Sequence, residues 1–230
     1  MSDVRTGVPV LAVTGMAFEA QIVRGRGVDV VFAARADWLE RALSEAVARG
    51  CSGIVSFGTA GGLAPDLEAG TLIVADAVVG PLGRIATDVT WSNRIADALP
   101  VGFRMRRGVM AGVTAPVTSE QQKRLLFQST GALAVDMESH IAGAIASARG
   151  LPFAVCRAIV DPAWRTLPTA ATAGLRDDGH TAIVPILREL LRQPSQFGAL
   201  LRLAGDARAA RTSLVQARQA MSAAGALAFD

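Results

Sequence analysis

The chain has 230 residues, of which 51% are hydrophobic, and its net charge is +3. A chain of this length and composition can bury a sizeable core, which excludes a disordered protein and favours one domain over two small ones. Its basic residues are scattered and almost all arginine, with Lys123 the only lysine. Because nucleic-acid binding needs basic residues gathered in a stripe, we interpret the positive charge as arginine usage and expect no nucleic-acid partner.

The two cysteines, Cys51 and Cys156, each lie in an apolar stretch, so we expect buried thiols in a reducing compartment. No metal-ligand spacing such as Cys-x-x-Cys occurs. Glu19 follows the first apolar stretch too closely for a signal peptide, and no uncharged run is long enough to span a bilayer. These features predict a cytoplasmic protein without a metal site.

Short β-branched stretches alternate with helical patterns over the first two thirds of the chain. The predicted strands are Val8–Val13, Val28–Ala33, Gly53–Phe57, Thr71–Val79, Gly108–Val113, Leu133–Asp136 and Phe153–Val160. The predicted helices are Ala36–Arg49, Ser119–Gln128 and Met137–Arg149. Strands that are apolar throughout are typical of a sheet covered on both faces. The alternation predicts an α/β layer fold with a mostly parallel sheet and a site at the carboxyl ends of its strands.

The pattern changes after Asp161. The stretch Pro162–Gly179 holds two prolines and no strand pattern, so we expect a loop. From Thr181 to Met221 the pattern is helical, with breaks at Pro194 and near Gly205. We therefore predict a single domain over residues 1–230, with a core at about 8–192 and a helical extension at about 193–230.

Two motifs follow the first and third predicted strands. Glu19, in Gly15-Met16-Ala17-Phe18-Glu19, is a candidate general base, although a glutamate in a first helical turn also complements the helix dipole. The stretch Gly58-Thr59-Ala60-Gly61-Gly62-Leu63 lets a ligand approach the backbone, or forms a tight structural turn. Neither motif decides between these alternatives by itself.

Two further motifs end later strands. In Val135-Asp136-Met137-Glu138 a carboxylate could accept hydrogen bonds from a vicinal diol, or it could serve the start of a helix. Asp161 ends an apolar strand, where apolar neighbours such as Val160 and Trp164 would raise its pKa and suit it to donate a proton. The alternative is an aspartate bonded to a turn, with Arg157 on the solvent side.

Together, and in this order, the four motifs resemble those of the purine nucleoside phosphorylase and nucleosidase superfamily, above all its methylthioadenosine/S-adenosylhomocysteine nucleosidase branch. The resemblance covers roughly residues 8–162. It implies a three-layer αβα sandwich with a mixed, mostly parallel sheet and C-terminal helices, and no cofactor. It also implies that Glu19 activates water and that Asp161 protonates the purine at N7. The substrate-binding residues that it implies are Met16, Thr59, Ala60, Gly61, Ala115, Pro116, Val117, Asp136, Met137 and Glu138.

The chain departs from the family pattern at several points. Val160 stands where the family often has serine, and Asp136 stands where glutamate is more usual. The phosphate loop of hexameric phosphorylases is missing after the first strand, which favours water over phosphate as nucleophile. The arginines left open as alternative phosphate ligands are Arg24, Arg84 and Arg107.

The C-terminal stretches Leu191–Phe197 and Asp206–Arg218 resemble hopanoid-associated members of this superfamily, which are thought to remove adenine from adenosylhopane. The resemblance implies a homodimeric nucleosidase for a 5′-substituted adenosine, with adenosylhopane preferred. A phosphorylase and a non-catalytic nucleoside-binding protein stay open as alternatives. The predicted helix has an apolar face around Leu201. This face could pack on the chain's own sheet, on a second subunit or on a membrane surface, and the sequence does not decide between them.

Overall fold

A computed structural model describes residues 7–173, 176, 178–180 and 182–227. Its strands are β1 (Val10–Thr14), β2 (Val28–Phe32), β3 (Gly53–Gly62), β4 (Leu72–Gly80), β5 (Gly83–Ala86), β6 (Met105–Gly112), β7 (Ala134–Asp136) and β8 (Phe153–Asp161). Its helices are α1 (Ala17–Val23), α2 (Ala36–Ala48), α3 (Val89–Ala98), α4 (Glu120–Thr130), α5 (Ser139–Ala148), α6 (Thr169–Ala173), α7 (Ile183–Arg192), a 3₁₀ turn η1 (Pro194–Gln196) and α8 (Phe197–Ala223).

The strands form one mixed sheet in the order β2-β1-β3-β7-β6-β4-β5, and β8 pairs with both β3 and β4. Most of the pairings are parallel, including β1 with β2 and β3, and β3 with β8. Strand β8 pairs with β3 in parallel and with β4 in antiparallel orientation. Because it joins these two strands, β3, β7, β6, β4 and β8 close into a ring. The predicted mixed, mostly parallel sheet is therefore confirmed, and the ring is an addition to it.

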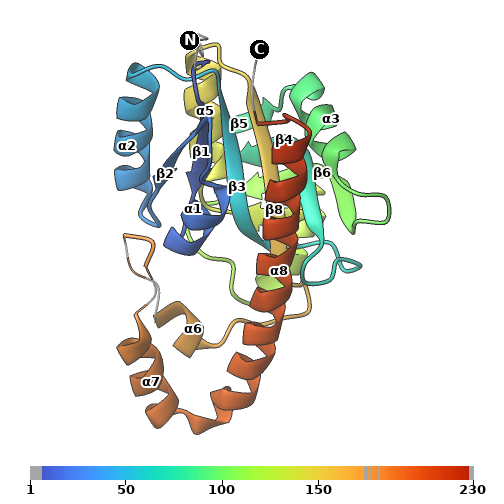
Figure 1. The fold of residues 1–230 in the computed structure, drawn as a ribbon. Helices are drawn as coiled ribbons and strands as arrows, with labels where there is room; N and C mark the ends of the chain where they lie inside the picture. Colours follow the sequence, from blue (N-terminus) through green and yellow to red (C-terminus); the bar gives the residue numbers. More distant parts are fainter. Residues whose placement is uncertain (1–6, 174–175, 177, 181, 228–230) are drawn as a thin grey trace.

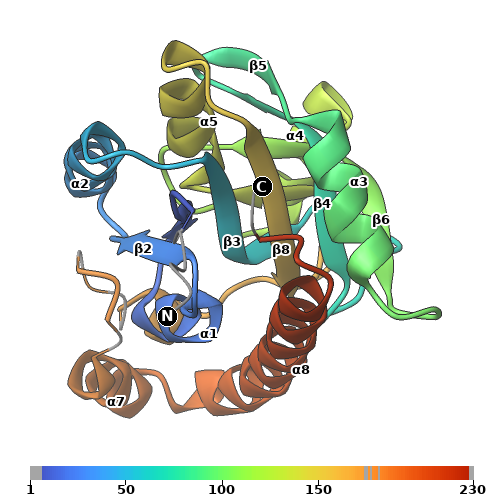
Figure 2. The ribbon, with the colours of Figure 1, turned by 45° about the horizontal axis from the view of Figure 1, so that its top comes forward.

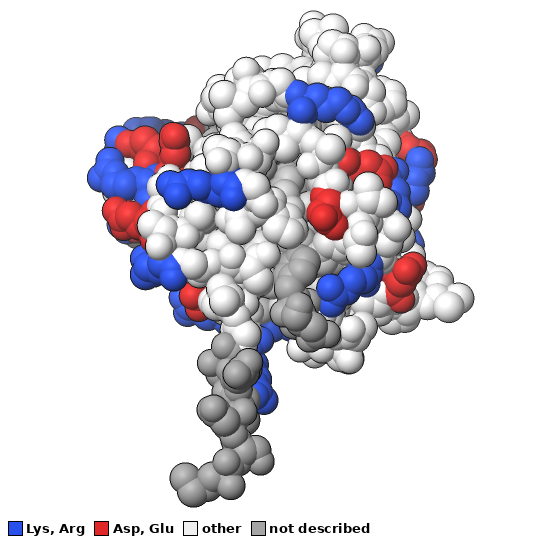
Figure 3. Space-filling model, turned by 90° about the horizontal axis from the view of Figure 1, so that it is seen from above, with Lys and Arg blue, Asp and Glu red and all other residues white. Residues whose placement is uncertain are grey.

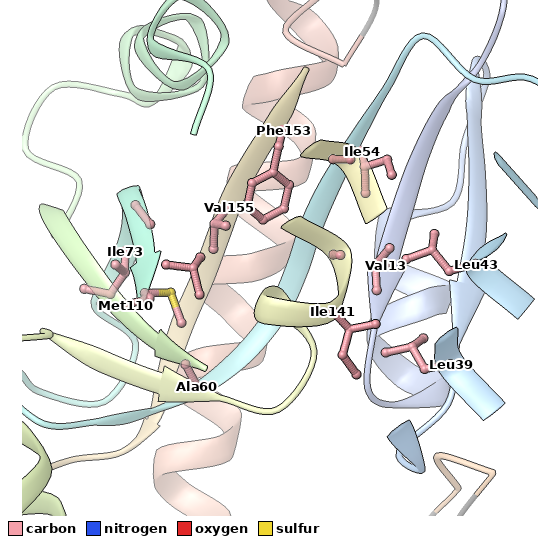
Figure 4. Packing of buried hydrophobic residues seen from close by; sticks show 14 of the residues in the cluster. Val13, Leu39, Leu43, Ile54, Ala60, Ile73, Met110, Ile141, Phe153 and Val155 are labelled. Atoms are coloured by element: carbon pink, nitrogen blue, oxygen red, sulfur yellow. The ribbon is translucent and has the colours of Figure 1, made fainter. Parts of the chain in front are cut away.

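Helices cover both faces of the sheet (Figures 1 and 2). On one face, α2 and α5 bury a cluster in which Ile141 lies near Val13 and Leu39 (Figure 4). On the other face, α1, α3 and α8 cover a second cluster that includes Trp91 and Leu214. Burial on both faces explains why the strands are apolar throughout.

The second half of α8 belongs to this second cluster, where its Leu214 and Met221 are fully buried. Arg218 donates from Nε to the backbone oxygen of Val23 at 2.7 Å, at the C-terminal end of α1. Trp91 Nε1 donates to the backbone oxygen of Ala226, also at 2.7 Å. This part of the predicted extension is thus integral to the core and fixes α1 against the sheet.

The segments α6, α7, η1 and the first half of α8 form an arm at the end of the sheet opposite the chain termini (Figure 1). The predicted loop over Pro162–Gly179 is wrong at α6, whose Ala170 is fully buried and donates from its backbone N to Gln196 Oε1. The predicted break near Gly205 is also wrong, because α8 runs through it. Thr181 lies outside the described residues.

Like α1 and α6, the elements β5 and α3 were not among those predicted from the sequence. The edge strand β5 is mostly exposed and lacks an alternating pattern, so only its pairing with β4 identifies it. Helix α3 begins at Asp88, whose side chain accepts a hydrogen bond from the backbone N of Trp91 at 2.7 Å. An aspartate N-cap of this kind is a sequence signal that could have identified α3.

On the face seen in Figure 3, the arginine side chains are separated by uncharged surface, and several lie near acidic ones. Across the residues that the structure describes, we find no helix with the length and apolarity needed to cross a membrane.

Candidate active site

A pocket lies where β1, β3, β7 and β8 end. All the predicted site residues except Ala115 line it, namely Met16, Glu19, Thr59, Ala60, Gly61, Pro116, Val117, Asp136, Met137, Glu138 and Asp161. Ala115 is exposed and does not line the pocket. The pocket brings together four motifs from distant parts of the chain, all within residues 7–173. Within the described chain, no group of three or more His, Cys, Asp or Glu could hold a metal ion.

Glu19 lies in the first turn of α1 and is buried. Its Oε1 accepts hydrogen bonds from the backbone N of Thr59 at 2.8 Å and from Thr59 Oγ1 at 2.7 Å. Its Oε2 accepts from the backbone N of Gly15 at 3.1 Å and of Met16 at 3.0 Å. Four donors match an ionised carboxylate, which only accepts hydrogen bonds. Of the four, the Thr59 hydroxyl can rotate away and free an oxygen lone pair.

Arg157 is buried in β8 beneath the pocket and pairs with two carboxylates. Its Nε lies 3.0 Å from Asp136 Oδ2, and its Nη2 lies 3.1 Å from Glu138 Oε2. Nη2 also donates to Ser56 Oγ at 2.7 Å. Asp136 is further bonded to the backbone N and the hydroxyl of Ser139. Asp136 borders the pocket, but its carboxyl oxygens are already bonded to Arg157 and Ser139.

Glu138 is the N-cap residue of α5, and its side chain faces the pocket. Burial, opposed by Arg157 and reinforced by the nearby Asp136 and Glu19, raises the pKa of Glu138 to about 7. The carboxyl of Glu138 also lies against Gly15. A carboxyl placed here is poised to change charge near neutral pH and to accept hydrogen bonds when ionised.

Asp161, the last residue of β8, is buried, and burial raises the pKa of its carboxyl. The ammonium of Lys123 opposes that shift, with its Nζ 2.6 Å from Asp161 Oδ2. Both carboxyl oxygens lie beside Gly61, where a Cβ would sit 3.3 Å from Oδ1. Asp161 therefore combines a raised pKa, which the sequence predicted, with a contact to the Lys123 ammonium, which it did not.

A family model described as Phosphorylase superfamily matches residues 7–182. This chain belongs to the phosphorylase superfamily. Among curated proteins, none matches it significantly in sequence. The family match agrees with the superfamily that the four motifs suggested.

Several solved structures share the fold of this phosphorylase-superfamily chain. The 5′-methylthioadenosine/S-adenosylhomocysteine nucleosidase of Neisseria meningitidis, in complex with methylthio-immucillin-A, has a TM-score of 0.69 at 14% identity over 93% of this chain and 98% of that one. The Helicobacter pylori nucleosidase of the same name has a TM-score of 0.67 at 17% identity, over 95% and 98%. Futalosine hydrolase of Helicobacter pylori has a TM-score of 0.67 at 16% identity, over 95% and 97%.

Sequence reasoning misplaced or missed several residues. Arg157 was considered on the solvent side, but it is buried and central to the site. Trp164 does not cover Asp161, because it is 48% exposed and lies in a separate groove near Leu63. Lys123 was noted only as the single lysine, although a lone lysine in an arginine-rich chain was a usable signal.

The arginines left open as phosphate ligands lie elsewhere. None of Arg24, Arg84 and Arg107 is among the described residues that line the pocket. Arg107 instead pairs with Asp76 at 2.6 Å. The only cation that borders the described pocket is Arg157, which two carboxylates already engage.

Proposed function

We propose that this chain is a nucleosidase that hydrolyses the N-glycosidic bond of a 5′-substituted adenosine and releases adenine. The observation that carries the proposal is that β3 brings a candidate base and a candidate acid to one pocket. Thr59 holds Glu19, and Gly61, two residues further along β3, lies beside Asp161. Two residues of strand span about 6–7 Å, so these two contacts lie close together along β3.

The proposed reaction is a single displacement at the sugar carbon C1′. Asp161 gives its proton to N7 of the purine, and the C1′–N9 bond breaks with its electron pair passing to the base. The sugar gains positive charge, which the carboxylates around it stabilise. Glu138 accepts hydrogen bonds from the 2′- and 3′-hydroxyls. Water adds to C1′ and loses a proton to Glu19, after the Thr59 hydroxyl has released an oxygen lone pair.

The charge of the pocket supports water over phosphate as nucleophile. The lining holds four carboxyl groups, Glu19, Asp136, Glu138 and Asp161, against the paired Arg157. A phosphate anion would meet net negative charge there, whereas a cationic sugar is favoured. The test is adenine release with phosphate absent and then added, with the sugar product identified by mass spectrometry. Strict dependence on phosphate, with ribose 1-phosphate as product, would identify a phosphorylase instead.

For the 5′ substituent we propose a large apolar group, with adenosylhopane preferred. The support is the resemblance of the C-terminal stretches and the apolar pocket lining by Met16, Val117 and Leu167. The test compares kcat/KM for adenosylhopane, methylthioadenosine and S-adenosylhomocysteine in one detergent buffer. A preference for the charged S-adenosylhomocysteine would contradict the proposal. Tight binding of all three without base release over hours would instead indicate a non-catalytic nucleoside-binding protein.

We also propose that the arm contacts an anionic membrane surface. Val184, Leu191, Phe197 and Leu201 are exposed on it, and Leu191 is 83% exposed. Exposed arginines such as Arg192 lie beside them, which suits negatively charged lipid. Flotation with phosphatidylglycerol vesicles tests this: the Leu191→Asp variant should lose binding. Binding that survives this change, or binding to neutral vesicles alone, would contradict it.

The predicted homodimer stays a prediction. Light scattering after gel filtration gives the mass in solution, and a mass of one 23.8 kDa chain at micromolar concentration would contradict it.

A further inference from the structure

Lys123, in the first turn of α4, is completely buried. Its Nζ contacts Asp161 Oδ2 at 2.6 Å and the backbone oxygen of the same residue at 3.0 Å. It also contacts the backbone oxygens of Pro162 at 3.0 Å and Arg165 at 2.9 Å. A buried ammonium is costly unless it is paired and hydrogen-bonded, and here every contact lies on the segment that begins at Asp161.

The lysine engages one side of the Asp161 carboxyl and leaves the other free. Oδ2 is held by Nζ, whereas no side chain in the described part of the protein donates to Oδ1. Both oxygens lie beside Gly61, a residue that lines the pocket. The free oxygen is therefore the one available to a ligand.

We propose that Lys123 is a positioning residue that makes Asp161 an effective acid, by holding Oδ2 so that Oδ1 meets the purine and by stabilising the carboxylate that remains. The inference rests on the proposed nucleosidase function. In the reaction the proton moves from Oδ1 to N7, the C1′–N9 electron pair goes to the base, and Lys123 keeps its own protons. Charge forms on Asp161 at that moment, next to a cation that is already in place.

Burial and Lys123 act on the pKa of Asp161 in opposite directions, and this balance suits the carboxyl to donate a proton. Burial raises the pKa of Asp161, which keeps the proton on the carboxyl, and Lys123 lowers it, which lets the proton leave. A group with a pKa matched to the working pH is the best general acid. Without the lysine, burial alone would hold the proton more tightly.

The same contacts explain why this position is a lysine in a chain whose other basic residues are arginines. A compact ammonium can donate in several directions to oxygens gathered around one point. A planar guanidinium is larger and directs its donors in a fork. Arg165 adds a further restraint, because its side chain pairs with Asp206 of α8 at 2.7 Å.

The first test compares Lys123→Met with Arg124→Met, the next residue of α4, which is exposed and pairs with Glu120 at 3.6 Å. Lys123→Met should lower kcat about 100-fold with KM little changed, as expected for a misplaced catalytic group. The alkaline limb of its kcat/KM profile should move to higher pH. Lys123→Arg should not restore the rate, and Arg124→Met should behave as wild type.

An unchanged kcat and pH profile in folded Lys123→Met would overturn the inference while leaving the nucleosidase function intact. Absence of base release by the wild-type protein would count against the function itself. The two failures are therefore distinguishable.

A second measurement needs neither turnover nor a lysine variant. Because the chain has one lysine, labelling with ¹³C,¹⁵N-lysine gives a single Cε–Nζ side-chain signal in NMR spectra. In the wild-type protein this signal should shift as Asp161 titrates, and the step should vanish in Asp161→Asn. The same titration curve in both proteins would overturn the pairing on which the inference depends.

Discussion

The carboxyl of Glu138 lies directly against the Cα of Gly15, so that a methyl group at Gly15 would overlap Oε1. Gly15 has no positive φ, and its backbone would accept alanine. The close approach of the carboxyl, rather than backbone conformation, is therefore what favours glycine here. Gly15, in the motif after β1, thus leaves the space that the side chain of Glu138, in the motif after β7, occupies.

Gly15→Ala should displace Glu138 and weaken sugar binding. Losing hydrogen bonds to a charged group costs about 1.5–3 kcal/mol, so KM should rise on the order of 10- to 100-fold. Stability should change little, because the side chain of Glu138 can move. The matched control is Gly205→Ala on α8, where no heavy atom lies within 4 Å of the added methyl. Equal KM values in the two variants would contradict this role of Gly15.

Asp161→Asn keeps the shape of the side chain but removes the acidic proton. Turnover should fall about 10²- to 10⁴-fold, the usual contribution of a general acid, while substrate binding is retained. Adenine release measures the first effect, and calorimetric titration with a substrate analogue measures the second. The exposed Asp66, which pairs with Arg106, provides the control variant Asp66→Asn. Full turnover in Asp161→Asn would refute the acid role.

Glu138 should give the activity profile an acid limb near neutral pH. Its pKa is raised to about 7, and only the ionised carboxylate accepts hydrogen bonds from both hydroxyls. Below about pH 7, kcat/KM should therefore fall about tenfold per pH unit. Glu138→Gln should be slower at every pH and should lack this limb. A limb that persists in the variant would have to come from another group.

The same raised pKa has a consequence for stability. Between the ordinary pKa of 4.5 and about 7, the folded protein holds a proton on Glu138 that the unfolded chain releases. The free energy of unfolding should therefore fall as pH rises through this window. Urea denaturation at several pH values measures the slope, and Glu138→Gln should flatten it. An equal slope in the two proteins would contradict the assignment.

Arg157→Met should be severely destabilising. It leaves Asp136 and Glu138 buried without their cation, and breaking a buried pair in this way costs about 3–5 kcal/mol. Arg107→Met, which breaks the partly exposed pair with Asp76, should cost about 1 kcal/mol or less. Urea denaturation of both variants gives the comparison, and similar losses in the two would show that burial of Arg157 does not matter.

The sequence located the pocket residues because each follows a short apolar strand, and strand ends of an α/β sheet meet. Local patterns could not locate Lys123, which lies 38 residues before Asp161 and belongs to a different element. The surroundings of Asp161 were likewise misjudged, because the neighbouring Trp164 turns toward Leu63 rather than the carboxyl. Proximity along the chain does not decide which side chains meet.

Some helix boundaries could be predicted from local sequence and others could not. The capping box of Ser119 and Gln122 starts α4 as the sequence predicted. In contrast, Gly205 does not end α8, since the helix continues into a second half that is buried against the sheet. Packing of the apolar face outweighs the weak helix propensity of one glycine.

The bond from Arg218 to Val23 joins the last long helix to the first short one, the helix that carries Glu19. During synthesis on a ribosome, α1 emerges long before α8. Until residue 218 has left the exit tunnel, one face of the sheet lacks part of its cover and the C-terminal end of α1 lacks an anchor. We therefore expect that deletion of the final helix exposes one face of the sheet and sends the product to proteases rather than yielding a shorter enzyme.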